Sequence, residues 1–154
     1  MGCGAKPCGL IERGVNEMDY SKLAEAAIAA KSMSYSPYSQ FQVGAALLTK
    51  SGKIYTGCNI ESAAYSPTNC AERTALFKAV SEGEREFLAI AIAGSAKNSS
   101  PNYCYPCGVC RQTLKEFVNN DFICIIAKTD SDYKIHPFGE LLPHSFGPED
   151  LGNV

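Results

Sequence analysis

Two short cysteine motifs constrain this chain more than any other part of its sequence. Cys70 and Glu72 belong to the first motif, and Cys107 and Cys110 belong to the second. Three thiols can bind one zinc ion and leave its fourth tetrahedral position open, which is typical of catalytic rather than structural zinc sites. A carboxylate beside that open position can accept a proton from an attacking water. The fold must therefore bring two distant segments together, and the pattern indicates zinc-assisted hydrolysis.

Both motifs lie where helices are expected to begin. Pro106 suits the first helical position or the one before it, and Thr68 or Asn69 can cap the other helix. The positive dipole ends of two helices would stabilise thiolates and lower their pKa. Because three thiolates over-neutralise a divalent cation, a nearby positive charge is also expected. Arg73 and Arg111, each directly after a motif residue, are the candidates.

Three other uses of these cysteines explain less of the pattern. Cys104 extends the second motif to C-x-x-C-x-x-C, but the next ligand of an iron–sulfur run would fall at Leu114. Cys104 or His144 could close a structural zinc site as a fourth ligand, which would leave Glu72 without a function there. A redox pair within the second motif would leave Cys70 unexplained. We therefore favour the open zinc site and interpret Cys104 as a loop residue.

The composition is that of one ordinary globular domain. The chain has 154 residues, of which 45% are hydrophobic and 19% charged, enough for one core but cramped for two domains. The net charge is -2, and Lys and Arg are scattered, so no basic face for nucleic acid is expected. No apolar run approaches the ~18 residues of a membrane span, so no membrane contact is expected.

The first residues and the cysteine usage bear on domain limits and cellular setting. Residues 1–18 are rich in Gly and lack the apolar segment of a secretory signal. We expect them to form a flexible N-terminal extension, followed by a single catalytic domain over 19–154. Eight cysteines without an export signal favour a reducing compartment, and we expect the cytoplasm. Cys58 and Cys124 lie in strand-like patterns and are expected to be buried.

Hydrophobic periodicity predicts helices that alternate with strands. The first helix should bury one apolar face, consisting of Leu23, Ala26, Ala27, Ala30 and Met33, and should end at Ser36-Pro37. A tight turn at Ser51-Gly52 predicts a hairpin. We expect helices over 19–35, 70–81 and 106–118, and strands over 41–49, 53–59, 87–93, 122–127 and 133–136. Helices between apolar strands predict an α/β fold, a layered sandwich on a mixed β-sheet.

The motif residues are similar to those of a known family. The strings CAER at 70–73 and PCGVCRQ at 106–112 resemble the zinc-dependent cytidine deaminases of the small, homotetrameric type. The likeness extends through SPYSQFQVGAA at 36–46, GCNIE at 57–61 and LLP at 141–143, and covers roughly residues 19–151. The resemblance implies a three-layer α/β/α sandwich with one Zn²⁺ per chain. It also implies hydrolytic deamination of cytidine and deoxycytidine to uridine and deoxyuridine, with release of ammonia, in pyrimidine salvage.

The resemblance also assigns site residues. It implies that the zinc ligands are Cys70, Cys107 and Cys110, and that Glu72 is the general acid and base. It further implies substrate contacts from Phe41 against the base, Asn59 and Glu61 on the ribose, and Ala71. Residues of a neighbouring subunit are expected to complete the site, namely Tyr65, Phe146 and Ala63.

A carboxylate at position 61 bears on the substrate class. If Glu61 accepts a hydrogen bond from a ribose hydroxyl, it would repel a phosphate a few Å away. Together with the acidic pI of about 5.7, this favours free nucleosides over nucleotides or polynucleotides. The competing hypotheses are a nucleic-acid-editing deaminase with the same zinc chemistry and a non-enzymatic zinc module. The sequence leaves open the preference between cytidine and deoxycytidine.

Overall fold

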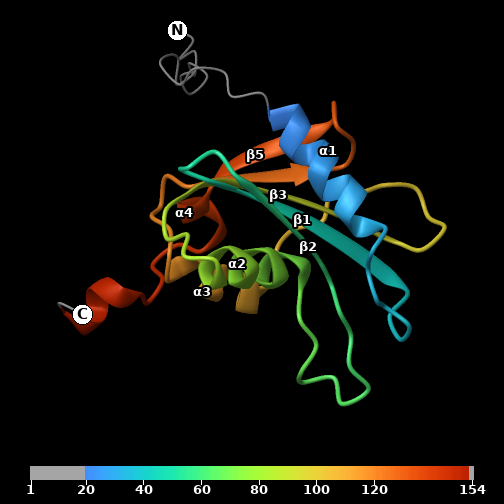
Figure 1. Cartoon of the computed structure of the whole chain (residues 1–154), viewed down its shortest axis with the longest axis horizontal. Coiled ribbons are helices and arrows are strands. Elements are labelled where there is room, and N and C mark those ends of the chain that lie inside the picture. The colour runs from blue at the N-terminus through green and yellow to red at the C-terminus, as the bar shows by residue number, and fades with distance from the viewer. Residues whose placement is uncertain (1–19, 153–154) are drawn as a thin grey trace, which may run out of the picture.

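The computed structural model describes residues 20–152, which build one five-stranded sheet with helices on both faces (Figure 1). The strand order is β2-β1-β3-β4-β5, and only the β3–β4 pair is parallel, so the sheet is mixed. The strands are β1 Phe41–Thr49, β2 Ile54–Cys58, β3 Phe87–Ala96, β4 Ile123–Ala127 and β5 Tyr133–Pro137. The helices are α1 Tyr20–Lys31, α2 Ala71–Ser81, α3 Gly108–Lys115, α4 Phe138–Leu141 and the 3-10 turn η1 Pro148–Leu151.

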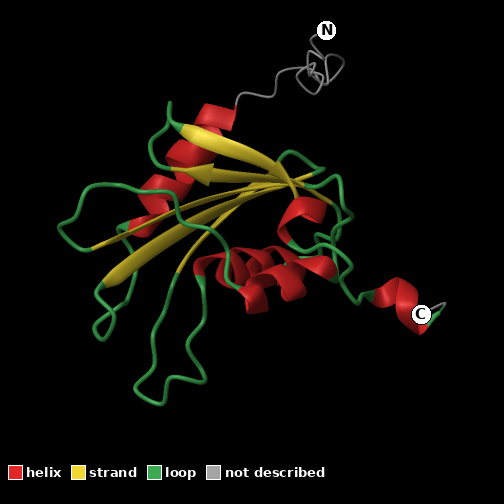
Figure 2. Cartoon of the chain, turned by 180° about the vertical axis from the view of Figure 1, so that it is seen from behind, coloured by secondary structure: helices red, strands yellow, loops and turns green. Residues whose placement is uncertain are grey.

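The two faces of the sheet carry side chains of different size. Along β3, Ile90 and Ile92 face α2 and α3, whereas the alternate residues Ala89 and Ala91 face α1. Large residues thus fill the layer under α2 and α3, and small ones allow α1 to lie close to the sheet (Figure 2). The contact between α1 and the sheet is tightest at Gly44 in β1, where a Cβ would overlap the α1 backbone. The result is the three-layer α/β/α sandwich that the resemblance implied.

Strand direction determines where the two cysteine motifs meet. Because β2 and β3 both run antiparallel to β1, they point the same way and their carboxyl ends lie at one end of the sheet. The chain leaves β2 toward α2 and leaves β3 toward α3, so both helices begin near that end. Phe41 starts β1 at the same end, opposite Ala96 at the end of β3. Residues far apart in the sequence therefore converge on one edge of the molecule.

The predicted hairpin, the helix at 70–81 and the strands at 122–127 and 133–136 are confirmed to within a few residues. The first helix is shorter than expected, ending at Lys31, and Met33 is consequently 76% exposed rather than buried. The helix after Cys107 ends at Lys115, three residues before the expected limit of 118. The prediction for Cys124 is confirmed, whereas Cys58 is only half-buried because it ends an edge strand.

The end predicted for β3 at Gly94 is wrong. The strand continues to Ala96 and pairs with β1 through Gly94. Glycine does not end the strand here but permits a close approach, since a Cβ at Gly94 would meet the Cys104 side chain and the Phe41 ring. The loop that carries Cys104 therefore packs directly on the strand beside Phe41.

The predictions for residues 1–18 lie outside the described residues. Within residues 20–152, no helix is long and apolar enough to cross a bilayer.

Candidate metal centre and active site

The three thiols that the sequence singled out meet at the convergent end of the sheet. The Sγ atoms of Cys70, Cys107 and Cys110 lie within 4.8 Å of one another. The Cys70 and Cys107 Sγ atoms are 3.8 Å apart. Tetrahedral zinc with bonds of ~2.3 Å places two sulfur ligands about 3.8 Å apart. The Cys70–Cys107 pair thus already has the spacing that zinc requires, and three soft sulfur donors suit zinc.

Both helices that begin here are capped by cysteine. Cys70 is the N-cap of α2, and Cys107 is the N-cap of α3. The Cys107 Sγ accepts a hydrogen bond from the Cys110 backbone N–H at 3.5 Å. The Cys70 and Cys107 sulfurs thus lie at helix starts, where unpaired N–H groups and the positive end of the helix dipole are located.

The alternative caps expected from the sequence are wrong. The Thr68 hydroxyl accepts from the Ser62 N–H at 3.1 Å, and the Asn69 amide donates to the Thr74 hydroxyl at 3.0 Å. These two side chains therefore brace the loop before α2, and Cys70 itself occupies the cap position.

Arg73 supplies a positive charge beside the thiols. Its Nη2 donates to the Thr68 carbonyl at 3.1 Å and to the Cys70 Sγ at 3.6 Å. A hydrogen bond from the Cys110 thiol, followed by the Arg73 guanidinium, lowers the pKa of Cys70 to about 5. The same shared proton, together with burial, raises the pKa of Cys110. Because cysteine binds a metal as the thiolate, a divalent cation at this site would displace the thiol protons.

Arg111 does not share this position. Its Nε donates to the Pro106 carbonyl at 2.8 Å, and its Nη1 donates to the Leu141 carbonyl at 2.6 Å. None of its described hydrogen bonds reaches a thiol, so Arg111 fixes the loop ahead of α3 rather than a ligand sulfur.

We expect Arg73→Gln to weaken zinc binding by ~10–100-fold, the usual effect of losing a group that supports a metal ligand. The reason is that the Cys70 thiolate loses both its charge partner and a hydrogen-bond donor. Competition with a chromophoric chelator measures the affinity. Arg85→Gln is the matched control, because Arg85 lies beyond the far end of α2 and, among the described residues, donates to the backbone carbonyls of Val80 and Glu84 and to no thiol. Equal affinities in the two variants would contradict a role for Arg73 at the thiols.

Glu72 is a buried carboxyl group beside the cluster. It lies in the first turn of α2, with only 3% of its surface exposed. Burial raises the pKa of Glu72 to about 7, and the charge of Cys70 adds to this effect. A carboxyl group with a pKa near neutrality can both accept and release a proton, which is what general acid–base catalysis requires. The Glu72 carboxyl group interacts with the charge of Cys70 and forms a hydrogen bond with Cys110, so it lies against the thiol cluster.

The fourth ligand of a closed zinc site is not found among the described residues. Neither Cys104 nor His144 belongs to the group of converging ligand atoms. Cys104 is half-buried, and burial raises the pKa of its thiol to about 11, so that it stays protonated. The group of three thiols therefore leaves one tetrahedral position of a bound metal open, next to Glu72.

The expected substrate residues of this chain line the same end of the sheet. Phe41, 39% exposed, begins β1. Asn59 follows β2 and is 8% exposed, with its side chain bonded to the Phe41 carbonyl and the Val43 N–H. Glu61 accepts from the Tyr38 and Ser39 backbone N–H groups at 2.9 and 3.2 Å. The Ser39 hydroxyl and these N–H groups lower the pKa of Glu61, so it presents a carboxylate at neutral pH.

The remaining expected residues differ in exposure. Ala71 is fully buried, so its contact with a substrate remains a prediction. Tyr65 is 72% exposed and packs edge-on against Tyr38 at 6.0 Å between ring centroids, and Ala63 is also exposed. Phe146 is 60% exposed, and its carbonyl accepts from the Gln112 amide at 2.9 Å. The side chains expected to act across an interface thus lie on the surface.

Two serines near the site were missed by the sequence analysis. Ser34 bonds to the Asn59 amide, and Ser39 bonds to Glu61. Both lie in the polar stretch around Pro37, where several hydroxyls occur and nothing in the pattern distinguishes one from another.

Comparison with known proteins agrees with this geometry. Residues 17–126 match the family described as the cytidine and deoxycytidylate deaminase zinc-binding region. The cytidine deaminase of Sporosarcina psychrophila is 46% identical over 134 residues, covering 87% of this chain and 96% of that protein. The cytidine deaminase of Halalkalibacterium halodurans is also 46% identical, covering 88% of this chain and all of that protein.

The similar solved structures are also cytidine deaminases. The crystal structure of cytidine deaminase from Burkholderia pseudomallei superposes with a TM-score of 0.76 at 44% identity, covering 84% of this chain and all of that one. The cytidine deaminase of Mycobacterium tuberculosis superposes with a TM-score of 0.73 at 34% identity, covering 85% of this chain and 99% of that one. The fold and the three-thiol centre define a zinc-dependent deaminase. The chain belongs to the cytidine deaminase family.

Proposed function

We propose that this protein is a zinc-dependent hydrolase that converts cytidine and deoxycytidine to uridine and deoxyuridine and releases ammonia. The observation that carries the proposal is the buried Glu72 beside three converging thiols. A buried carboxyl group whose pKa is raised, next to groups that can bind a metal, is typical of a functional site. The cytidine deaminases that match almost all of this chain support the same reaction.

The proposed chemistry uses the ligand set and Glu72 in separate roles. Cys70, Cys107 and Cys110 hold the zinc, which acts when bound as a Lewis acid that makes an attacking water more acidic. Glu72 takes a proton from the water as its oxygen attacks carbon 4 of the cytosine ring, and delivers a proton to ring nitrogen 3. Glu72 then assists proton transfer to the amino group, which leaves as ammonia. The sum is cytidine plus water giving uridine plus ammonia.

The substrate is proposed to be a free nucleoside. Phe41 would pack against the base, while Asn59 and Glu61 would bond the sugar. The ionised Glu61 carboxylate would repel a nearby phosphate, and the chain's net charge of -2 gives no compensating basic face. Ammonia release from cytidine, cytidine monophosphate and single-stranded DNA tests this choice. We expect efficient turnover of cytidine only; salt-sensitive turnover of the DNA would support an editing enzyme instead.

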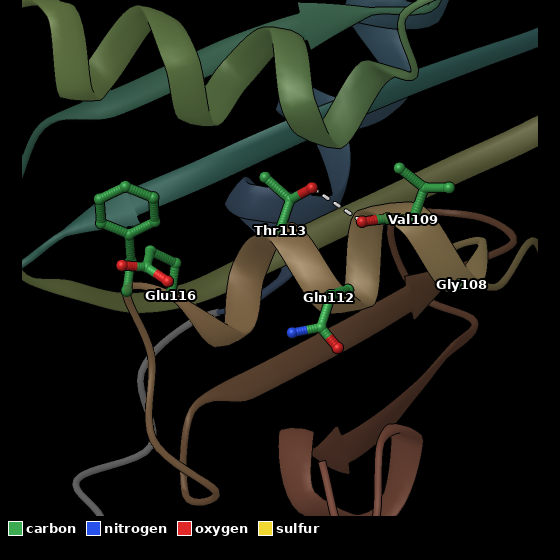
Figure 3. A pocket seen from close by; sticks show the side chains of 6 residues that line it. Gly108, Val109, Gln112, Thr113 and Glu116 are labelled. Carbon is green, nitrogen blue, oxygen red and sulfur yellow. Dashed lines mark hydrogen bonds between the residues drawn. The ribbon is translucent and has the colours of Figure 1, made fainter. Parts of the chain in front are cut away.

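A homotetramer is proposed because apolar side chains remain uncovered on the site side of the molecule. Val109, Phe146 and Tyr65 are between 59% and 72% exposed. A hollow of about 550 Å³ also lies on the outer face of α3, opposite the buried face that carries Cys110 and Leu114 (Figure 3). It does not contain the thiols, and its lining residues are Gly108, Val109, Gln112, Thr113, Glu116 and Phe117. Exposed patches of this kind commonly mark interaction surfaces.

If neighbouring subunits contribute residues to one active site, two defective variants should restore activity when their subunits are mixed. We expect Phe146→Ala to lower kcat/KM by about tenfold, because an aromatic anchor at an interface contributes ~1–2 kcal/mol. When Phe146→Ala subunits are mixed with inactive Glu72→Gln subunits and reassembled, some sites should combine an intact Glu72 with an intact Phe146 from a neighbour. Activity above the average of the two parents is the expected result. Activity equal to that average would contradict a Phe146 that acts across the interface, and sedimentation measures the assembly state in parallel.

We further propose that residues 19–154 act as one catalytic domain. The cytoplasm is the proposed location, because three ligand thiols must remain reduced to bind zinc. All six cysteines described in the structure are free thiols, which is compatible with that setting.

A further inference from the structure

A short set of hydrogen bonds holds the Asn59 side chain in one orientation. Its Oδ1 accepts from the Val43 backbone N–H at 2.9 Å and from the Ser34 hydroxyl at 2.5 Å. Its Nδ2 donates to the Phe41 carbonyl at 2.9 Å. Backbone groups cannot exchange donor and acceptor roles, so a reversed amide would face an N–H with an N–H and a carbonyl with a carbonyl. The orientation of this amide is therefore determined by its partners.

These hydrogen bonds leave one N–H of the Asn59 side-chain amide without a partner among the described residues. An asparagine amide can accept two hydrogen bonds and donate two, and here both acceptor positions are filled. Only one Nδ2 hydrogen has a partner among residues 20–152. Asn59 is 8% exposed, and an unpaired donor in so buried a position is unfavourable. The remaining N–H of Asn59 is thus available to an acceptor from outside the chain.

Glu61 provides a hydrogen-bond acceptor beside the free N–H of Asn59. Ile60 bridges to Tyr35 and to Asn69, so the backbone from 59 to 61 is extended. Side chains two residues apart on extended backbone lie on the same face, which places Asn59 and Glu61 side by side. A donor next to an ionised carboxylate suits a hydroxyl group, which accepts from one and donates to the other.

Ser34 is the donor in its bond to Asn59. Asn59 Oδ1 can only accept, so the Ser34 hydroxyl supplies the hydrogen of this 2.5 Å bond. The Ser34 hydroxyl is also placed to donate to the Ser36 hydroxyl at 3.1 Å, and the two contacts share its single hydrogen. The bond to Asn59 is the shorter of the two, so it is the one that Ser34 favours.

We propose that Ser34 is a positioning residue that holds Asn59 as a hydrogen-bond donor toward a sugar hydroxyl of the substrate. This inference rests on the proposed nucleoside deaminase function. Ser34 does not touch the substrate; it acts through Asn59.

The test compares two substrates in two variants. We expect Ser34→Ala to lower kcat/KM for cytidine by about 3–10-fold, mainly through KM, the usual effect of one lost hydrogen bond. For 2′,3′-dideoxycytidine, which lacks the 2′ and 3′ hydroxyls of the sugar, the same variant should change kcat/KM, or the inhibition constant against cytidine, by less than about twofold. Ser34→Thr keeps the hydroxyl and should restore cytidine binding. Ser32→Ala is the matched control, because Ser32 is exposed and bonds only within its own helix turn.

The outcomes separate this inference from the function on which it rests. Equal losses for cytidine and the dideoxy nucleoside in Ser34→Ala, or no loss for either, would overturn the positioning role and leave the deaminase function intact. Failure of the zinc-loaded parent protein to deaminate cytidine would instead remove the proposed function itself.

Discussion

Glu72→Gln is expected to yield a folded, zinc-containing protein whose turnover of cytidine is lower by about 10²–10⁴-fold or more, the effect of losing a positioned acid and base. Glutamine has nearly the same volume as glutamate, so the 3% exposed site stays filled. It cannot take up or release a proton, and in this reaction one carboxyl group serves more than one transfer. The loss should therefore appear in kcat rather than in zinc content, and both are measured on the same preparation.

Glu86→Gln is the matched control for this variant. Glu86 forms an exposed ion pair with Lys50 at 2.7 Å, and such pairs contribute little to stability. The control should retain the parent's activity and zinc content. Substantial deamination by a homogeneous Glu72→Gln sample would remove Glu72 from the catalytic role.

Cys107→Ala is expected to lower the zinc content from about one ion per chain to nearly none. The variant removes one of only three thiols that converge, and no other described cysteine or histidine joins them. It also removes the sulfur that caps α3 through the Cys110 N–H. A metal present at a thousand times its Kd stabilises a folded protein by about 4 kcal/mol, so the free energy of unfolding should fall by a similar amount.

Cys104→Ala separates the ligand role from cysteine content in general. Cys104 lies three residues before Cys107 but outside the converging thiols. The zinc content of the Cys104→Ala variant should equal that of the parent when measured by metal analysis after dialysis. Loss of zinc in Cys104→Ala, with zinc retained in Cys107→Ala, would reverse the proposed ligand assignment.

The sequence predicted the helix and strand pattern where a physical signal was strong. The hairpin at 41–58 follows from two strand-like segments around a tight turn, and the helix predicted over 70–81 matches α2 at Ala71–Ser81. The convergence of the two motifs could also be anticipated, because a catalytic zinc needs all three thiols. Strand direction then explains how the fold achieves it, since the carboxyl ends of β2 and β3 meet at one edge.

The errors arose where tertiary packing decided the local structure. Gly94 suggested the end of a strand, yet it lies within β3 because Cys104 and Phe41 pack closely against it. Thr68 and Asn69 are good capping residues by type, but Cys70 occupies the cap position of α2. Local preference could not reveal either arrangement, because each depends on a neighbour distant in the sequence.

Side-chain roles within the site were the least predictable. Arg73 and Arg111 have equivalent positions beside their motifs, yet only Arg73 donates to a thiol, whereas Arg111 binds backbone carbonyls. The sequence also suggested Asn59 as a ribose contact, which remains a prediction. The sequence could not show that the Asn59 side chain also connects the start of β1 to Ser34 through hydrogen bonds.

The central claim is that three thiols and one carboxyl group form a zinc-dependent centre for nucleoside deamination. Its most direct test is the ultraviolet spectrum and ammonia release of the protein incubated with cytidine, before and after a zinc chelator. We predict conversion of cytidine to uridine with equimolar ammonia, loss of conversion in the chelator, and recovery when zinc is returned. No conversion by a sample that contains one zinc per chain would contradict the claim.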